Sequence, residues 1–289
     1  MRRIKESKLL SFIVVAIVYI LATILQVVLF NFINIGNLYL KLLIVDVIAT
    51  VLVFMFSLIF DNASIYDPYW SVEPLIIVSL LMSNNKLNFP VIISFGIVFF
   101  IWGLRLTINW ALSFNNLTKQ DWRYTLLKEK TKKLYPLVNF FGIHLFPTLI
   151  VYLGLLPAIH LIQVNYTNYF IYIGIGIMLL GVVIEIIADY DIYLYHKRNK
   201  EDHRQIITSG LWKYSRHPNY LGEIIFWYGV FFSMLPIDFG SIYFIIGAIA
   251  INFMFIFISI PMIEKRMKTY KFNYEKYQEE TRMLLPFKK

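Results

Sequence analysis

The feature that most constrains this chain is a series of long apolar segments separated by short polar ones. Most of these segments are about 20 residues long, the length with which an α-helix crosses the hydrocarbon core of a bilayer. They cover residues 9–30, 38–60, 74–82, 89–114, 135–162, 169–195, 218–235 and 241–263. Only helices and closed barrels satisfy every backbone polar group inside lipid. The pattern therefore predicts an all-α, polytopic transmembrane helical bundle with about seven or eight spans.

The distribution of basic residues supports a topology for this bundle. Four segments hold 24 of the 27 lysines and arginines, namely residues 1–8, 115–134, 196–216 and 263–289. With eight spans all four lie on one side of the membrane, and the positive-inside rule makes that side cytoplasmic. We expect a multi-pass protein of the cytoplasmic membrane with both termini in the cytoplasm. The net charge of +9 then reflects topology and anionic lipids rather than a nucleic-acid partner.

Composition excludes several classes of site. The chain has no cysteine, so thiolate catalysis, disulfides and iron–sulfur clusters are ruled out. Its five histidines show no HExxH motif and no pairing at metal-ligand spacing, so we expect no metal. No linker, low-complexity tract or repeat divides the sequence. A single membrane domain over residues 1–289 is the simplest organisation.

The stretch LWKYSRHPNYLGEIIFWYG, residues 211–229, combines polar groups with an apolar run. Pro218 suits the first position of a helix, where its missing N–H costs nothing. The backbone N–H groups of Asn219 and Tyr220 then lie at the positive end of a helix, where anions bind. Arg216 and His217 stand beside that end, and Asn219 shares a helix face with Glu223. The stretch indicates either a phosphate-binding helix start or an interfacial one whose arginine reaches lipid phosphate.

A second polar pattern lies in VIEIIADYDIYLYHKRNK, where four residues recur at three- or four-residue spacing: Glu185, Asp189, Tyr193 and His196. A carboxylate in the middle of a membrane helix costs about 2.5–3.5 kcal/mol on insertion scales. Two acids on one face therefore indicate a polar cavity or cationic partners, for which Arg216 and Arg266 are candidates. Internal ion pairing and a ribose-and-phosphate ligand both fit this pattern.

Two further motifs supply candidate reactive groups. IYDPYWSVEP carries Asp67, Tyr69 and Glu73, although an aromatic turn at the membrane interface also explains its Tyr and Trp. WGLRLTINW places Arg105 within an apolar span, where it needs an acidic partner such as Asp67 or Glu73.

Local spacing yields two structural expectations. The small residues Gly174, Gly176 and Gly181 follow no strand and form no dinucleotide fingerprint, so we expect them to allow close helix packing. Glu264 and Lys268 are four residues apart and are expected to form an i,i+4 pair.

These motifs together resemble the membrane steroid 5-alpha-reductase-like superfamily, and most closely its mostly bacterial branch. The resemblance runs over residues 67–287 through DPYWS, WGLRLTINW, DWRY, FFGIHLFPTL, IEIIADY, RHPNYLGE and SIPMIEKRM. It implies an all-helical membrane fold with a cytoplasm-facing NADPH pocket. It also implies hydride transfer to a carbon–carbon double bond of a lipidic substrate, such as a sterol-like, enone or isoprenoid compound. Residues 1–134 would form the substrate side and residues 135–289 the cofactor-binding part.

The resemblance assigns roles residue by residue. Asn219 and Glu223 match the cofactor pair of the family's NYxGE motif, and Asp189 matches the acid of the family's segment ending in SDY, which reads ADY here. His196 falls where the reductases place a phosphate-binding arginine, and Arg266 aligns loosely with another cofactor contact. On the substrate side Trp102 occupies the position of the reductases' tyrosine, so Tyr69 or Asp67 is expected to supply the proton near Arg105.

Two other functions remain open from the sequence. Isoprenylcysteine carboxyl methyltransferases share an RHPxYxG element and bind S-adenosylmethionine, although Glu223, DPYWS and IADY are additional here. A lipid-binding membrane protein without turnover would keep the same fold. Binding of NADPH or of S-adenosylmethionine distinguishes these functions from one another.

Overall fold

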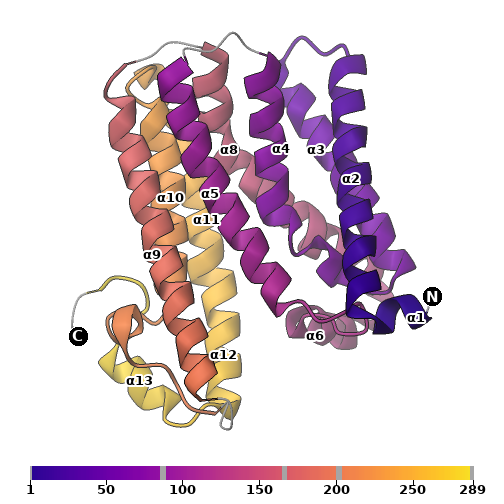
Figure 1. Ribbon diagram of the computed structural model, residues 1–289, viewed down its shortest axis with the longest axis vertical. Helices are drawn as coiled ribbons and strands as arrows, with labels where there is room; N and C mark the ends of the chain where they lie inside the picture. Colours follow the sequence, from indigo (N-terminus) through magenta and orange to yellow (C-terminus); the bar gives the residue numbers. More distant parts are fainter. Residues whose placement is uncertain (1, 85–88, 165–167, 200–203, 287–289) are drawn as a thin grey trace. The chain divides into compact units, whose positions relative to one another are not determined.

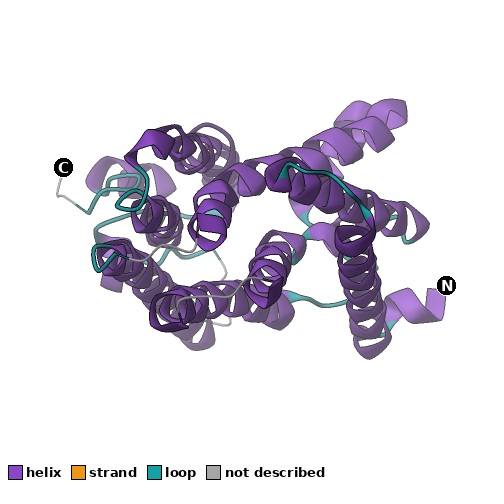
Figure 2. Ribbon diagram, turned by 90° about the horizontal axis from the view of Figure 1, so that it is seen from above, coloured by secondary structure: helices purple, strands orange, loops and turns teal. Residues whose placement is uncertain are grey.

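The computed structural model describes residues 2–84, 89–164, 168–199 and 204–286, and these fold into helices joined by short loops (Figure 1). No strand occurs in these ranges, as Figure 2 also shows, and the nearest approach to one is an isolated bridge between Ser215 and Arg282. The predicted all-α, polytopic helical bundle is confirmed.

Each apolar block of the sequence forms a helix, but the blocks differ in length. Six helical stretches within the described residues are long and apolar enough to cross a membrane: Lys8–Phe32, Leu38–Ile59, Pro90–Ser113, Trp122–Val164, Ile171–Arg198 and Phe239–Tyr270. The other two blocks form α4, Tyr69–Asn84, and α10, Pro218–Met234, of 16 and 17 residues. At 1.5 Å per residue both are shorter than a bilayer core of about 30 Å. The described part of the chain thus contains six helices of spanning length, against the seven or eight spans expected.

The chain forms two compact units. The first comprises Met1–Leu87 and Phe99–Gln163, and the second comprises Asn88–Val98 and Val164–Lys289. These units group segments by contact and not by role, so the division into a substrate side and a cofactor part at residue 134 stays a prediction.

The first unit contains the amino-terminal helices. Its elements are α1 (Arg2–Glu6), α2 (Lys8–Phe32), α3 (Leu38–Ile59), η1 (Ala63–Tyr66), α4, most of α5 (Phe89–Ser113), α6 (Trp122–Thr131), η2 (Lys132–Leu134), α7 (Tyr135–Val138), η3 (Asn139–Leu145) and α8 (Phe146–Val164). Side-chain caps begin two of the long helices: Ser7 accepts from the backbone N–H of Leu10, and Asn37 from that of Leu40.

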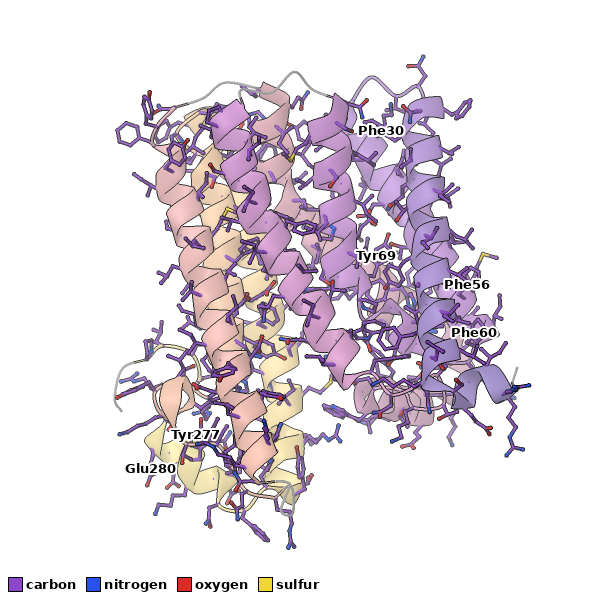
Figure 3. All side chains as sticks on the ribbon, viewed as in Figure 1. Phe30, Phe56, Phe60, Tyr69, Tyr277 and Glu280 are labelled. Atoms are coloured by element: carbon purple, nitrogen blue, oxygen red, sulfur yellow. The ribbon has the colours of Figure 1, made fainter. Side chains whose placement is uncertain are left out.

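The core of the first unit forms where α2 and α3 pack together. Val15, Val18 and Ala22 recur at helical spacing on one face of α2, and they join Ala49 and Val53 of α3 in one buried cluster. Small and β-branched residues on the facing surfaces let the two helices approach closely. Figure 3 labels Tyr69 within this unit, between Phe30 near one end and Phe60 toward the other.

The second unit contains the carboxy-terminal helices. Its elements are α9 (Ile171–Arg198), η4 (Gly210–Lys213), α10, η5 (Phe239–Phe244), α11 (Ile245–Met254), η6 (Phe255–Ser259), α12 (Ile260–Tyr270) and α13 (Tyr274–Glu280). Helices α9 and α10 run side by side (Figure 1).

Glycines set the distance between α9 and α10. A Cβ atom on Gly174 would lie 2.2 Å from the backbone nitrogen of Ser233, and one on Gly181 would lie 2.6 Å from the carbonyl oxygen of Gly222. The close packing predicted for Gly174 and Gly181 is therefore confirmed. For Gly176 the prediction is wrong, because its Cβ position meets nothing within 4 Å.

Candidate functional site

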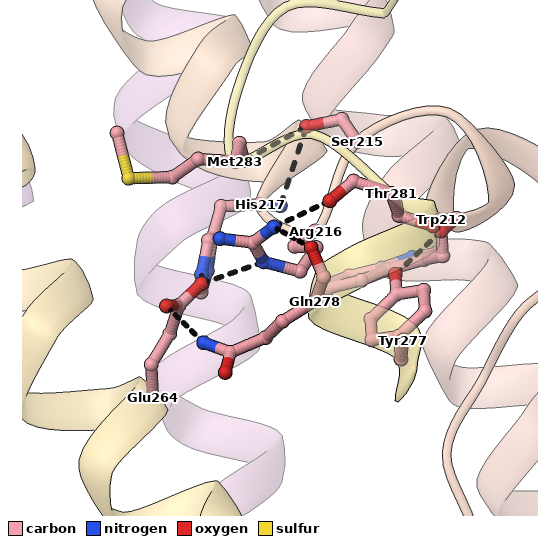
Figure 4. Close-up of polar contacts among 9 residues, drawn as sticks. All are labelled: Trp212, Ser215, Arg216, His217, Glu264, Tyr277, Gln278, Thr281 and Met283. Carbon is pink, nitrogen blue, oxygen red and sulfur yellow. Dashed lines mark hydrogen bonds and ion pairs between the residues drawn. The ribbon is translucent and has the colours of Figure 1, made fainter. Parts of the chain in front are cut away.

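In the second unit, the carboxylate of Glu264 is hydrogen-bonded both to the residues before α10 and to α13. Glu264 of α12 accepts from Arg216 Nε at 2.7 Å and lies 3.0 Å from His217 Nε2, both through Oε1 (Figure 4). Its other oxygen, Oε2, accepts from Gln278 Nε2 of α13 at 2.6 Å. The Arg216 and Glu264 side chains are only 8% and 13% exposed, so water screens their attraction weakly. One carboxylate thus balances Arg216 and contacts His217, the two residues that precede α10.

The chain after α13 is held against the same arginine. Arg216 Nη1 donates to the carbonyl oxygens of Gln278, at 3.2 Å, and of Thr281. The Arg216 backbone N–H donates to the Arg282 carbonyl at 3.0 Å, and the Ser215 hydroxyl donates to that of Met283 at 3.3 Å. The guanidinium therefore acts here as a structural clamp on Gln278 and Thr281, and the Arg216 backbone and Ser215 hold the two residues that follow. Its predicted role as a phosphate ligand remains a prediction.

Helix α10 begins at Pro218, as the sequence predicts. His217 precedes it, and the first helical hydrogen bond runs from the Leu221 N–H to the His217 carbonyl at 3.0 Å. The His217 ring stacks on Tyr220 with centroids 5.6 Å apart, and Tyr220 stacks on Phe255 at 4.6 Å. This aromatic stack fixes the imidazole orientation at the helix start.

Two acids are buried where α9 and α10 meet. Glu223 is 4% exposed, and its Oε1 accepts from the indole nitrogen of Trp227 at 2.9 Å. Glu185 is fully buried, and a Cβ atom on Gly222 would lie 2.5 Å from its Cγ atom. Asn219 lies half-buried one turn before Glu223 on the same helix. The structure therefore brings together the predicted pair Asn219–Glu223 and the acid Glu185 on neighbouring helices.

The other predicted cofactor residues become more exposed toward the end of α9. Asp189 is half-buried, whereas His196 is exposed. Arg266 lies on α12, half-buried, with its guanidinium 5.9 Å from the centroid of the Tyr270 ring. A neighbouring acid, Asp191, accepts from the backbone N–H of Leu211 at 3.2 Å and so positions the segment before α10.

An open cavity of about 440 Å³ lies beside the Arg216 clamp in the second unit. It is bounded by η4, α13 and the following residues: Thr208, Lys213, Tyr214, Tyr277, Glu279, Glu280 and Thr281. Its volume falls in the range of small-molecule sites, and its lining residues carry hydroxyl, ammonium and carboxylate groups beside a larger apolar area.

In the first unit, Tyr69 contacts an acid that the sequence reading missed. The Tyr69 hydroxyl donates to Asp46 of α3, to Oδ1 at 3.0 Å and to the carbonyl at 3.1 Å. Gln26 of α2 donates to Glu73 Oε1. All four side chains are at most 3% exposed, so α2, α3 and α4 enclose two carboxylates. Buried polar groups of this kind need internal partners, which these bonds supply in part, since Gln26 Oε1 and Glu73 Oε2 make no hydrogen bond within the described residues.

Hydrogen bonds extend this polar region to α8. The Tyr66 hydroxyl lies 2.8 Å from Thr148 Oγ1, which lies 3.0 Å from Thr50 Oγ1. The Tyr66 ring stacks on Tyr69 with centroids 5.1 Å apart. His144 is fully buried, and its Nδ1 lies 3.0 Å from the Asn139 carbonyl.

Asp67 has a different partner from Tyr69. The Tyr124 hydroxyl donates to Asp67 Oδ1 at 2.7 Å, and Asp121 bonds Arg123 nearby at 2.8 Å. Burial raises the pKa of Asp67 to about 6, against the lowering effects of the Tyr124 hydrogen bond and of Arg123. This carboxyl group therefore titrates close to neutral pH, as a proton-transfer group requires.

The predicted catalytic residues thus occupy distinct local environments. Tyr69 bonds Asp46, Asp67 bonds Tyr124, and Arg105 is half-buried on α5. Within the described ranges no group of three or more His, Asp or Glu residues is arranged to hold a metal ion.

Three acids with structural importance escaped the sequence reading. Asp46 was detectable, because a lone acid inside an apolar span is costly and usually has a partner or a function. Asp191 also lies inside an apolar block, residues 169–195, and gave the same signal. The role assigned to Glu264 was wrong: it does not pair with Lys268, whose carboxylate partner is Glu275 at 4.0 Å. The partners of Glu264 are 47 and 48 residues earlier in the chain, beyond the reach of a local spacing rule.

The sequence of this chain is similar to that of a known protein over about half of its length. The chain is similar to an uncharacterized protein of Schizosaccharomyces pombe, with 28% identity over 149 residues. The match covers 44% of this chain and 43% of the yeast protein, so the chain spans less than half of that relative's length. No solved structure matches the chain.

A family model matches residues 53–281, from the middle of α3 to the residues that Arg216 clamps. This region includes Tyr69, Asp67, the buried acids of α9 and α10, and Glu264, whereas Asp46 lies before it. That family is related to membrane steroid reductases. The chain belongs to the DUF1295 family, described as a protein of unknown function and placed in the steroid 5-alpha-reductase-like superfamily.

Proposed function

We propose that this chain is an integral-membrane, NADPH-dependent reductase of a carbon–carbon double bond in a lipidic substrate. The observation that carries the proposal is the face of α10 formed by Asn219 and the buried Glu223, in a chain of this superfamily. The resemblance of RHPNYLGE to the motif of the mostly bacterial branch of this superfamily supports the proposal. The substrate is expected to be sterol-like, an enone or an isoprenoid.

The residues of the second unit fit a nicotinamide cofactor in part. An amide and a carboxylate one helical turn apart offer donors and acceptors for a carboxamide or ribose hydroxyls. The Trp227 indole holds the Glu223 carboxylate in one orientation, so little side-chain entropy is lost on binding. Asp189 would add a ribose contact.

The phosphate end requires rearrangement or additional cations. Glu264 already balances Arg216, so a phosphate must either displace this carboxylate or bind through other groups. His217, at the start of α10, and the backbone of Asn219 and Tyr220 would contribute there. His196 and Arg266 supply the remaining positive groups in the proposal.

The chemistry divides between cofactor and protein. NADPH would supply the hydride, and the protein would supply orientation and a proton. Tyr69 would donate that proton from its hydroxyl, with Asp46 holding the hydroxyl in place. Asp67 is the alternative donor, and Arg105 would stabilise negative charge on the substrate oxygen. Tyr69, Asp67 and Arg105 lie in segments matched by the family model.

Ligand titration of the detergent-purified protein tests the cofactor assignment. We expect NADPH to raise the midpoint of thermal unfolding and S-adenosylmethionine to leave it unchanged. Glu223→Gln and Asn219→Ala should each weaken NADPH binding about tenfold or more, since a lost hydrogen bond to a charged group costs about 1.5–3 kcal/mol. Glu275→Gln, an exposed acid on α13, is the matched control and should bind NADPH normally.

Two other outcomes of the ligand titration would favour the alternative functions. Stabilisation by S-adenosylmethionine alone would indicate a methyltransferase. Binding of neither cofactor by well-folded wild-type protein would indicate a lipid-binding protein without turnover.

A further inference from the structure

A second cavity lies in the first unit, away from the residues assigned to proton donation. Its volume is about 240 Å³, and the end of α3, η1, α6, η2, α7 and η3 enclose it. Six polar residues contribute to its wall: Ser57, Asp61, Asn62, Lys128, Lys132 and Asn139. Tyr135 completes the polar part of the lining.

Two polar atoms of this lining lack a protein partner. The Tyr135 hydroxyl and Asn139 Oδ1 are both buried and make no hydrogen bond within the described part of the chain. Asn139 uses its Nδ2 group to donate to Ser57 Oγ at 3.2 Å, so its carbonyl oxygen is oriented by a fixed amide. The Gln120 side chain is close enough to influence the Tyr135 hydroxyl but does not meet hydrogen-bond geometry with it, and Gln120 Oε1 accepts from the backbone N–H of Ala63 at 2.8 Å. Buried polar atoms without partners are rare, and a bound polar ligand is one way to satisfy them.

The charged groups of the cavity are unbalanced. Lys128 Nζ bonds both oxygens of Asp61, at 2.6 and 2.8 Å, and these two charges cancel. Lys132 is exposed at the rim and leaves one positive charge in excess among the lining residues. A ligand with a single negative charge would restore neutrality.

The surroundings of the cavity are apolar and exposed. Leu58, which also lines the cavity, is 46% exposed, and Ile59 and Met55 on the same end of α3 are more so. On the other side of the cavity, Leu134 and Leu137 are exposed as well. Apolar side chains exposed on a membrane helix contact acyl chains. A molecule in this cavity would therefore carry a polar head and acyl chains along these residues.

We propose that this cavity binds the headgroup of an anionic glycerophospholipid that bears a headgroup hydroxyl, of the phosphatidylglycerol type. The phosphodiester carries one negative charge and pairs with Lys132. The headgroup hydroxyl donates to Asn139 Oδ1 and accepts from the Tyr135 hydroxyl. The site is independent of the proposed reductase activity, because none of its residues belongs to the cofactor or proton-donor sets.

The test measures thermal unfolding of delipidated protein in neutral detergent with added lipids of identical acyl chains. We expect phosphatidylglycerol to raise the unfolding midpoint, and phosphatidylcholine and phosphatidylethanolamine to raise it less than half as much. Glycerol 3-phosphate and inorganic phosphate should produce no comparable shift. An equal effect of all three lipids, or an equal effect of the soluble phosphates, would overturn the proposal.

Two variants locate the effect in the cavity. Tyr135→Phe removes a hydroxyl that makes no protein hydrogen bond, so it should leave the lipid-free midpoint unchanged. We expect it and Lys132→Gln each to lose at least half of the shift produced by phosphatidylglycerol. Lys133→Gln, the adjacent exposed lysine outside the lining, should keep the full shift. Full shifts in both Tyr135→Phe and Lys132→Gln would show that the lipid acts elsewhere.

Discussion

Glu264 accepts a hydrogen bond from Arg216 at 2.7 Å across 48 residues of sequence. Through its second oxygen Glu264 also holds Gln278 of α13. A single carboxylate therefore connects the segment before α10 with α12 and α13. In this structure the most prominent cation of the RHPNYLGE motif is a structural partner of the carboxy-terminal segment.

Substitution Glu264→Gln should destabilise the second unit markedly. Loss of the carboxylate leaves the Arg216 guanidinium largely buried without its counter-charge, and breaking a buried pair in this way costs about 3–5 kcal/mol. Thermal unfolding in detergent and limited proteolysis after α13 measure the effect. The exposed pair of Lys268 and Glu275 provides the control, because Glu275→Gln should cost less than about 1 kcal/mol. Equal midpoints for the two variants would contradict the structural role of Glu264.

Substitution Gly222→Ala should separate α9 from α10. The added Cβ would lie 2.5 Å from Glu185 Cγ and 2.7 Å from the Gly181 carbonyl oxygen, and the backbone contact cannot be relieved by a rotamer change. Overpacking of this kind costs about 1–3 kcal/mol. Gly176→Ala is the matched control, since its Cβ meets open space. The midpoint of thermal unfolding should be lower for Gly222→Ala than for wild type, and for Gly176→Ala it should equal or exceed that of wild type.

Asp67 should make stability depend on pH between about 4 and 6. Its pKa rises from the ordinary 3.8 to about 6 in the folded chain, so folding favours the protonated carboxyl. This contribution is fully present below pH 4 and is lost as the pH rises through 6. Its size is about 3 kcal/mol, from 1.36 kcal/mol per pKa unit.

The variant Asp67→Asn tests the contribution of Asp67 to the pH dependence of the free energy of unfolding. The amide oxygen can still accept from Tyr124, but the group no longer titrates. Unfolding midpoints across the pH range should therefore fall less steeply in Asp67→Asn than in wild type. Parallel pH profiles would show that Asp67 keeps its ordinary pKa in the folded protein.

Tyr69→Phe should slow reduction of the lipid acceptor by about 10²–10⁴-fold, the usual contribution of a general acid. NADPH affinity should be unchanged, because Tyr69 belongs to no cofactor contact in the proposal. The hydrogen bond lost to Asp46 costs about 1 kcal/mol of stability. The rate of NADPH oxidation and direct NADPH binding are the two measurements.

Tyr66→Phe controls for the loss of a buried hydroxyl. Tyr66 stacks on Tyr69 and bonds Thr148, so its variant loses a comparable hydrogen bond but no proposed proton donor. A normal rate in Tyr69→Phe together with a slow rate in Asp67→Asn would transfer the donor role to Asp67.

The features that local sequence decides were predicted well. Apolar blocks became helices because length and composition alone determine that outcome in lipid. Helix α10 begins at Pro218 because proline suits the first helical position, where its missing N–H costs nothing. The two blocks that do not form a full-length span, residues 74–82 and 218–235, are also the shortest ones in the sequence, and they form helices of 16 and 17 residues.

The features that depend on distant contacts were not predictable in the same way. Arg216 was expected beside a ligand or the acids of α9, whereas its carboxylate partner is Glu264. The hydrogen bond between Asp46 and Tyr69 joins α3 and α4, and no spacing rule relates their positions. A charge inside an apolar helix signals that a partner exists, but the identity of that partner follows only from tertiary packing.

The contact between Arg216 and the residues after α13 also has a consequence for synthesis. Glu264 is translated 48 residues after Arg216 and Thr281 is translated 65 residues after it. At a synthesis rate of about 5–20 residues per second, several seconds pass between the synthesis of Arg216 and that of these partners. During that interval the Arg216 guanidinium of the ribosome-bound intermediate must stay in water or among the lipid headgroups. The start of α10 therefore reaches its final position late in membrane insertion.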